Sequence, residues 1–259
     1  MKQLIPVLLA CAVPFGTSYA QDETAQEPTA SERFDALEEE VEIADEAWVT
    51  AIRKDYAAAE EAGEELPPER FTRPYAQFVP KFQAAATDYA GTEDAVQFLG
   101  WLATTGMSVD EDAGKAAIDS LFESHIKSEG LEAIQYILPD LGRYYDEEKA
   151  KALVAQVEKE SPVKSIRAWA TWARLKGTLS TADVKSEEFT KAKAEMMAAL
   201  EDVDAGYLGE MINGEVTVRE KFSIGMVAPD IDGIDLDGTE FKLSDYKGKI
   251  LFVDFWGDW

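Results

Sequence analysis

The spacing of apolar residues changes once along this chain of 259 residues, and that change limits what the chain can fold into. From residue 31 to about residue 205, apolar residues recur three and four positions apart between breakers, which is typical of helices with one buried face. The first stripe consists of Phe34, Leu37, Val41, Ala44, Trp48 and Ala51. After residue 221 the spacing becomes strand-like. We therefore predict a mainly α protein, with a multi-helix N-terminal domain followed by a segment that contains strands.

Local signals divide the helical region further. Thr29 and Glu32 have the spacing of a capping box, which predicts a helix start near residue 30. Further starts near Thr92, Ser128 and Ser161 are 36 and 33 residues apart, a spacing typical of helix-pair repeats. The first stripe needs a partner, either the following helices or a second copy of the chain, and we favour the helices. Three glycines, Gly206, Gly209 and Gly214, predict that residues 206–221 form a connection and not a helix.

The net charge and the N-terminal residues indicate which partners the protein can have and where it is located. The balance of 25 Lys and Arg against 51 Asp and Glu gives a formal net charge of -26, which argues against nucleic acid or an anionic membrane surface as a partner. Residues 1–20 resemble a signal peptide, with Lys2, an apolar stretch from Leu4 to Phe15 that is too short to span a bilayer, and a cleavage site after Ala20. We expect export to a periplasmic or extracellular space, with residues 21–30 as a flexible linker.

The only cysteine is Cys11, inside the predicted signal peptide. Cleavage after Ala20 would leave a mature chain of residues 21–259 without cysteine, and therefore without a disulfide or a thiolate metal site. Lipoprotein processing at Cys11 is the alternative that we favour less. His125, the only histidine, is interpreted as a surface or capping residue without a catalytic role.

The final segment, residues 222–259, carries the most specific pattern. Asp237-Gly238 predicts a hairpin turn. The apolar run from Ile250 to Phe255 predicts a strand buried on both faces of a sheet, interrupted by one charge at Asp254. A buried aspartate is costly unless it has a partner or a function. The chain then ends with Trp256-Gly-Asp-Trp259.

Several phrases of this segment resemble the thioredoxin-like redoxins, in particular the exported TlpA/ResA-like thiol–disulfide oxidoreductases, which are related to the AhpC/TSA peroxiredoxins. They are Ile224-Gly225, Ala228-Pro229-Asp230-Ile231, Asp235-Leu-Asp-Gly238, Phe241 to Lys249, and Val253-Asp-Phe-Trp-x-x-Trp259. The resemblance implies a thioredoxin-like α/β domain and a C-x-x-C redox pair directly after Trp259. It further implies protein or small-molecule disulfides and thiols as substrates, with no cofactor and no metal.

By the same resemblance, Asp254 would be the catalytic acid and base that relays a proton to the second thiol. Its alternative interpretation is a carboxylate at the end of a strand, facing water. Phe255, Trp256, Asp258 and Trp259 would flank the redox site. The sequence stops one residue before the expected nucleophile, so we expect the chain as given to be inactive. One hypothesis is that the next codon is UGA, which encodes selenocysteine; a nonsense mutation, a frameshift or a cloned fragment are the alternatives.

Two other functions stay open at this point. The chain could be a helical binding or scaffolding protein with a vestigial redoxin remnant. It could also be an exported peroxiredoxin-like peroxidase, although the Trp-x-x-Trp tail favours the disulfide oxidoreductases.

Overall fold

A computed structural model describes residues 27–201, 203 and 206–254, and the predicted signal peptide lies outside this part. Eight α-helices occupy the described part: α1 (Ala30–Ala62), α2 (Val79–Asp88), α3 (Ala95–Thr104), α4 (Glu111–Ser124), α5 (Glu147–Glu160), α6 (Lys164–Thr181), α7 (Glu187–Leu200) and α8 (Gly206–Phe222). Short 3-10 helices are η1 (Pro68–Phe71), η2 (Gly106–Ser108), η3 (Glu129–Ile134), η4 (Leu138–Arg143) and η5 (Leu243–Tyr246). Strands β1 (Asp232–Ile234) and β2 (Glu240–Lys242) follow α8. The prediction of a mainly α protein with a few strands after the helices is confirmed.

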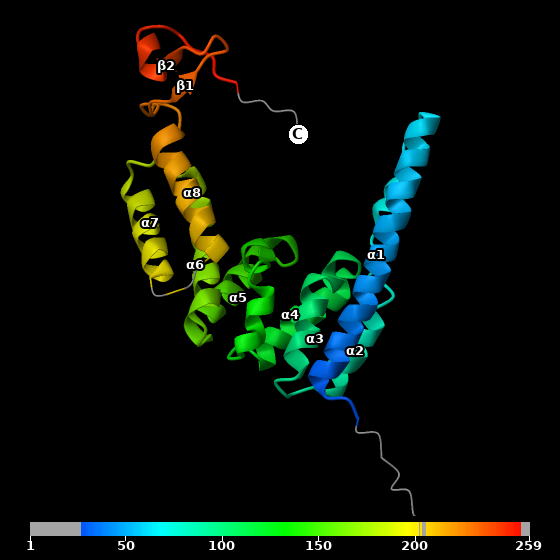
Figure 1. Cartoon of the computed structure of the whole chain (residues 1–259). Helices are drawn as coiled ribbons and strands as arrows, with labels where there is room; N and C mark the ends of the chain where they lie inside the picture. The colour runs from blue at the N-terminus through cyan, green and yellow to red at the C-terminus, as the bar shows by residue number, and fades with distance from the viewer. Residues whose placement is uncertain (1–26, 202, 204–205, 255–259) are drawn as a thin grey trace, which may run out of the picture.

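Helix α1 begins where its capping box predicts. The Thr29 side chain accepts a hydrogen bond from the backbone N–H of Glu32, and the Glu32 carboxylate accepts one from the backbone N–H of Thr29 at 2.8 Å. Its apolar stripe packs against the next helices, as favoured over a second copy: the Phe34 ring meets the rings of Phe82 and Phe98 edge-on, at 5.9 and 5.5 Å between centroids. Figure 1 shows the opposite end of α1 projecting past the neighbouring helices.

The remaining helices form an array in which sequence neighbours pack together (Figure 1). Helix α3 packs against α2, α4 and η3, and α6 packs against α5, α7 and η4. Fully buried side chains fill the spaces between them: Phe82, Phe98, Phe189, Ile118, Leu121, Leu131, Ile134, Leu138, Leu141, Ile166, Leu179 and Met196. Contacts between sequence neighbours are the arrangement expected of stacked helix pairs.

Residues 206–222 form helix α8, so the prediction that the glycines break any helix here is wrong. Leu208, Ile212 and Val216, spaced four apart, are buried, and α8 packs against α6. Each glycine in a helix interior costs about 1 kcal/mol relative to alanine, while burying one large aliphatic side chain stabilises by about 1.5–3 kcal/mol. The buried stripe therefore outweighs the glycines. The division of the chain into domains stays a proposal.

The predicted buried strand at the C-terminal end is also corrected. Residues 250–254 form no strand, and Ile250 and Phe252 are 102% and 94% exposed. A strand buried on both faces needs neighbours to pair with and helices to cover it. Within the described residues, the only sheet is the two-stranded hairpin of β1 and β2, and its strands pair with each other.

No helix among the described residues is both long enough and apolar enough to cross a lipid bilayer.

Candidate functional site: the C-terminal hairpin segment

The hairpin after α8 contains most of the phrases that carry the redoxin resemblance. Strands β1 and β2 are antiparallel, with Gly233 opposite Phe241. The Phe241 ring lies over Gly233 so closely that a Cβ at this position would be 2.8 Å from the ring. Tyr246 of η5 meets the same ring edge-on, at 6.3 Å between centroids. A larger residue at position 233 would force this ring to shift.

The turn between the strands is built around Asp235, the first residue of one of the phrases that resemble the redoxins. Its carboxylate accepts hydrogen bonds from the backbone N–H groups of Asp237 and Thr239, at 2.9 and 2.8 Å. Gly238 has a φ of 80°, the left-handed conformation that glycine adopts at least cost. The predicted hairpin turn at Asp237-Gly238 is confirmed, with the aspartate two residues earlier holding it closed.

A second aspartate joins the strand entry to η5. The carboxylate of Asp230 accepts hydrogen bonds from the Ser244 hydroxyl at 2.7 Å and the Ser244 backbone N–H at 2.8 Å. These two bonds, the hydroxyl's first, lower the pKa of Asp230 below its ordinary value. The Leu243 N–H donates to the Ile231 carbonyl at 2.9 Å beside them. The phrases 228–231 and 241–249 are thus brought together in space.

The predicted redox-site residues lie at the end of this segment. Asp254 is exposed and lies outside any strand, and its predicted role stays a prediction. Phe255, Trp256, Asp258 and Trp259 lie outside the described residues. The described structure therefore holds together the phrases that precede the predicted site in the sequence. The contacts that do so involve Asp230, Ser244 and Phe241.

Apolar side chains of this segment face water. Ile224, Val227, Leu236, Ile250 and Phe252 are each more than 90% exposed. Burying such a side chain stabilises a protein by about 1.5–3 kcal/mol. These five side chains do not contribute that stabilisation, because they are exposed to water. The segment thus presents several exposed apolar side chains close together in the sequence.

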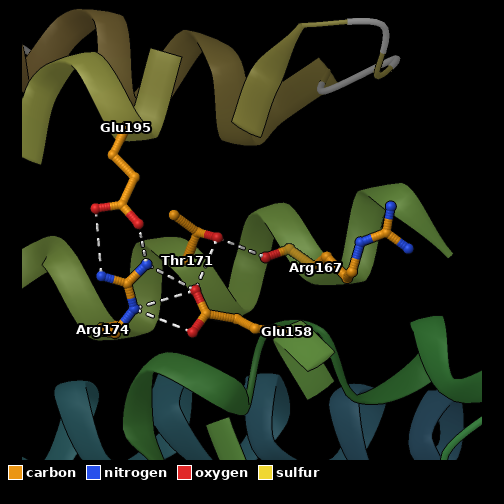
Figure 2. A network of polar contacts seen from close by, with 5 residues as sticks. All are labelled: Glu158, Arg167, Thr171, Arg174 and Glu195. Carbon is orange, nitrogen blue, oxygen red and sulfur yellow. Dashed lines mark hydrogen bonds and ion pairs between the residues drawn. The ribbon is translucent and has the colours of Figure 1, made fainter. Parts of the chain in front are cut away.

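Elsewhere, the most connected polar group is Arg174, which no sequence pattern indicated. Its guanidinium on α6 binds Glu158 of α5 at 2.9 Å and Glu195 of α7 at 2.6 Å (Figure 2). The Thr171 hydroxyl, one turn earlier, donates to Glu158 at 3.0 Å and lies equally near the Arg167 carbonyl. The two carboxylates raise the pKa of Arg174. This network joins three helices, so we interpret it as structural.

The lead-in phrases and the hairpin that carries them support a thioredoxin-like redoxin as the class to which the C-terminal segment belongs. Short stretches are similar to proteins named thiol-disulfide oxidoreductase ResA: 43% identical over 49 residues in Bacillus thuringiensis subsp. konkukian, and 44% over 43 residues in Geobacillus thermodenitrificans. These stretches cover 19% and 17% of this chain, and 28% and 25% of the relatives. The chain thus spans about a quarter of the length of the curated relatives it matches.

No family model matches the chain. No solved structure matches it either.

Proposed function

We propose that this chain belongs to an exported thiol–disulfide oxidoreductase of the thioredoxin-like class, in which the helical array precedes the redox domain. The observation that carries the proposal is the agreement between the similarity to the ResA proteins and the hairpin segment at residues 222–254. Disulfides and thiols of proteins or small molecules are the corresponding substrates. The predicted signal peptide, residues 1–20, is the basis for placing the protein in a periplasmic or extracellular space.

The proposed reaction needs a nucleophile at the position that follows Trp259, either cysteine or selenocysteine. Its thiolate or selenolate attacks one sulfur of a substrate disulfide and displaces the other as a thiolate, which gives a mixed disulfide. A cysteine three positions further then attacks the mixed disulfide and releases the second substrate sulfur. The enzyme is oxidised to its disulfide, or selenenylsulfide, and the substrate is reduced by the same two electrons.

Asp254 is the proposed acid and base for the second step. A carboxylate near the resolving thiol can take its proton before attack and give it to the substrate thiolate that leaves. This role requires Asp254 to be enclosed by the rest of the redox domain, because its side chain is exposed in the described part of the chain.

The genomic reading frame tests the position of the nucleophile. A cysteine codon or UGA directly after the Trp259 codon, with a cysteine codon three positions further, supports the proposal, and any other arrangement contradicts it. The protein expressed from that extended frame should reduce insulin with dithiothreitol as the electron source. The chain of residues 21–259 alone should show no turnover in the same assay.

The role of Asp254 is tested in the extended protein by Asp254→Asn, with Asp237→Asn in the exposed turn as the control. We expect slower turnover for Asp254→Asn, by about 10²–10⁴-fold for loss of a general acid or base, and an altered pH profile. The control should match the parent. An unchanged rate and pH profile for Asp254→Asn would remove this residue from the mechanism and leave the nucleophile untouched.

A further inference from the structure

A cavity lies at the C-terminal end of α1, where the chain turns back toward the helix. Gly63 has a φ of 70°, and the Glu64 backbone N–H donates to the Ala59 carbonyl at 2.9 Å, which ends the helix. The Arg70 side chain of η1 donates to the Asp55 carboxylate of α1 at 2.5 Å and ties the returning chain to the helix. The cavity between them has a volume of about 440 Å³, within the range of about 300–1,000 Å³ that is usual for ligand sites.

Two aromatic rings line this cavity, one from each of the segments that form it. Tyr56 follows Asp55 on α1, and Phe71 follows Arg70 at the end of η1, so the ion pair between Asp55 and Arg70 brings both rings to the same cavity. The two aromatic residues are 60% and 49% exposed, so the protein itself leaves their rings accessible. The face of an aromatic ring attracts cations, because its π electrons carry partial negative charge.

Carboxylates supply the remaining polar lining of the cavity. Glu60, Glu64 and Glu65 are exposed and line it together with the rings, and no lysine or arginine does. Among the described residues these three carboxylates form no ion pair, because Arg70 and Arg73, close by in the sequence, are bound to aspartates of α1. The cavity therefore combines two accessible rings with unpaired negative charge, and both features are complementary to a cation.

An arginine side chain fits this combination best. Its planar guanidinium can stack on a ring face while its N–H groups donate to carboxylates, and its apolar stem can cover Leu66. The lysine ammonium is a compact and strongly hydrated point charge that does not stack. The net charge of -26 attracts a positively charged partner. Figure 1 shows that this end of α1 projects past the neighbouring helices, where a large partner can reach it.

We propose that the cavity at the C-terminal end of α1 binds an arginine side chain of a partner polypeptide, through the rings of Tyr56 and Phe71 and the carboxylates of Glu60, Glu64 and Glu65. This inference goes beyond the proposed redox function and does not depend on it. Binding involves no electron transfer, so a failure of either proposal leaves the other standing.

The test uses the chain of residues 21–259 and a nonapeptide of glycine and serine with one central arginine and with acetylated and amidated ends. NMR titration at 0.15 M NaCl, where the Debye length is about 8 Å, reports binding residue by residue. We expect saturable shifts of the amide resonances of residues 59–71. A peptide with citrulline, which has the shape of arginine without its charge, should bind at least about tenfold more weakly. A lysine peptide should bind about two- to fivefold more weakly than the arginine peptide, because it loses the stacking.

Substitutions of aromatic residues test the contact with the rings. Tyr56→Leu and Phe71→Leu keep an apolar side chain but remove the ring face, so each should weaken binding about two- to fivefold. Tyr207→Leu, at a 63% exposed tyrosine of α8 outside the cavity, should leave binding unchanged. All three positions are exposed, so the variants should fold, and thermal unfolding by circular dichroism checks this.

Removing the same charge in two places separates the cavity from the acidic surface as a whole. Glu64→Gln combined with Glu65→Gln should weaken binding at least about threefold, because two carboxylates of the cavity lose their charge. Glu188→Gln combined with Glu201→Gln removes two charges from exposed positions at the two ends of α7 and should have little effect.

The proposal is overturned if residues 59–71 show no saturable shifts, or if the citrulline or lysine peptide binds as tightly as the arginine peptide. Equal weakening by the two charge variants would also overturn it, because general attraction to the acidic surface would then explain the binding. The same holds if Tyr56→Leu and Phe71→Leu both bind as tightly as Tyr207→Leu.

Discussion

The carboxylate of Asp230 and the backbone N–H of Ser244 are joined by a 2.8 Å hydrogen bond across fourteen positions of the sequence. With the hydroxyl bond to the same serine, this contact closes the segment around the hairpin, because it fixes the chain before β1 to the 3-10 helix after β2. Two of the phrases that resemble the redoxins therefore have a structural reason to occur together.

Acidification should open this contact. Since the folded pKa of Asp230 lies below the ordinary value of about 3.9, the contact contributes stability that is fully present above pH 3.9 and is lost as pH falls through the lowered pKa. The Ser244 amide resonance should report the titration in NMR spectra. Asp230→Asn should abolish the titration and speed hydrogen exchange of the Ser244 amide, whereas Asp237→Asn should change neither. A Ser244 amide that still titrates in Asp230→Asn would contradict this assignment.

Arg174 should contribute to the stability of the helical array. We expect Arg174→Met to lower the free energy of unfolding by about 1 kcal/mol, because the guanidinium is partly exposed and water screens both ion pairs. Lys151→Met, which removes a pair with Glu147 whose side chains are 67% and 78% exposed, should change it by less than about 0.5 kcal/mol. Urea unfolding measures both. Equal effects of the two variants would show that the network in Figure 2 has no special role.

Two glycine-to-alanine substitutions should have opposite effects. A Cβ at Gly114 of α4 would lie 2.8 Å from the Met107 Cα, so Gly114→Ala should destabilise the protein by about 1–3 kcal/mol. At Gly177 of α6 a Cβ meets nothing within 4 Å, so Gly177→Ala should stabilise by about 1 kcal/mol through helix propensity alone. Thermal unfolding should move the two melting temperatures in opposite directions. A shift in the same direction would contradict the packing around one of the two sites.

Helix α8 should behave as part of the helical array. Ile212 is 0% exposed, and Ile212→Ala should cost about 2–5 kcal/mol, whereas Val218→Ala at a 55% exposed position should cost little. A chain ending at residue 222 should keep the stability of the whole array. A chain ending at residue 205 should lose the contacts of α8 with α6 and melt at a lower temperature. Equal melting of the two shortened chains would instead favour the predicted connection at 206–221.

Residue patterns predicted the features that depend on near neighbours in sequence. The capping box at Thr29, the buried faces of the helices and the turn at Gly238 each involve residues within a few positions of one another. The patterns failed where contacts between residues far apart in the sequence determine the structure. Glycines in α8 suggested a break because propensity ignores the stripe packed on α6, and the run from Ile250 suggested a strand although the hairpin does not pair with it.

The sequence patterns also predicted part of the candidate site. The lead-in phrases pointed to the hairpin segment, and the ResA matches support the class that they implied. The turn itself was predicted, but the hydrogen bonds that its backbone N–H groups donate to the Asp235 carboxylate were not, because a linear pattern does not record such contacts. The proposed role of Asp254 depends on polypeptide that would enclose it and stays a prediction.

Because α8 packs on α6 and ends at Phe222, the last turn of a helix determines the direction in which the chain leaves the array. One residue inserted into α8 before Phe222 would turn the following chain by about 100° around the helix axis and advance it by about 1.5 Å. An insertion of seven residues would nearly restore the original direction, about 10 Å further out. The length of α8 thus determines the direction in which the chain continues after the helix.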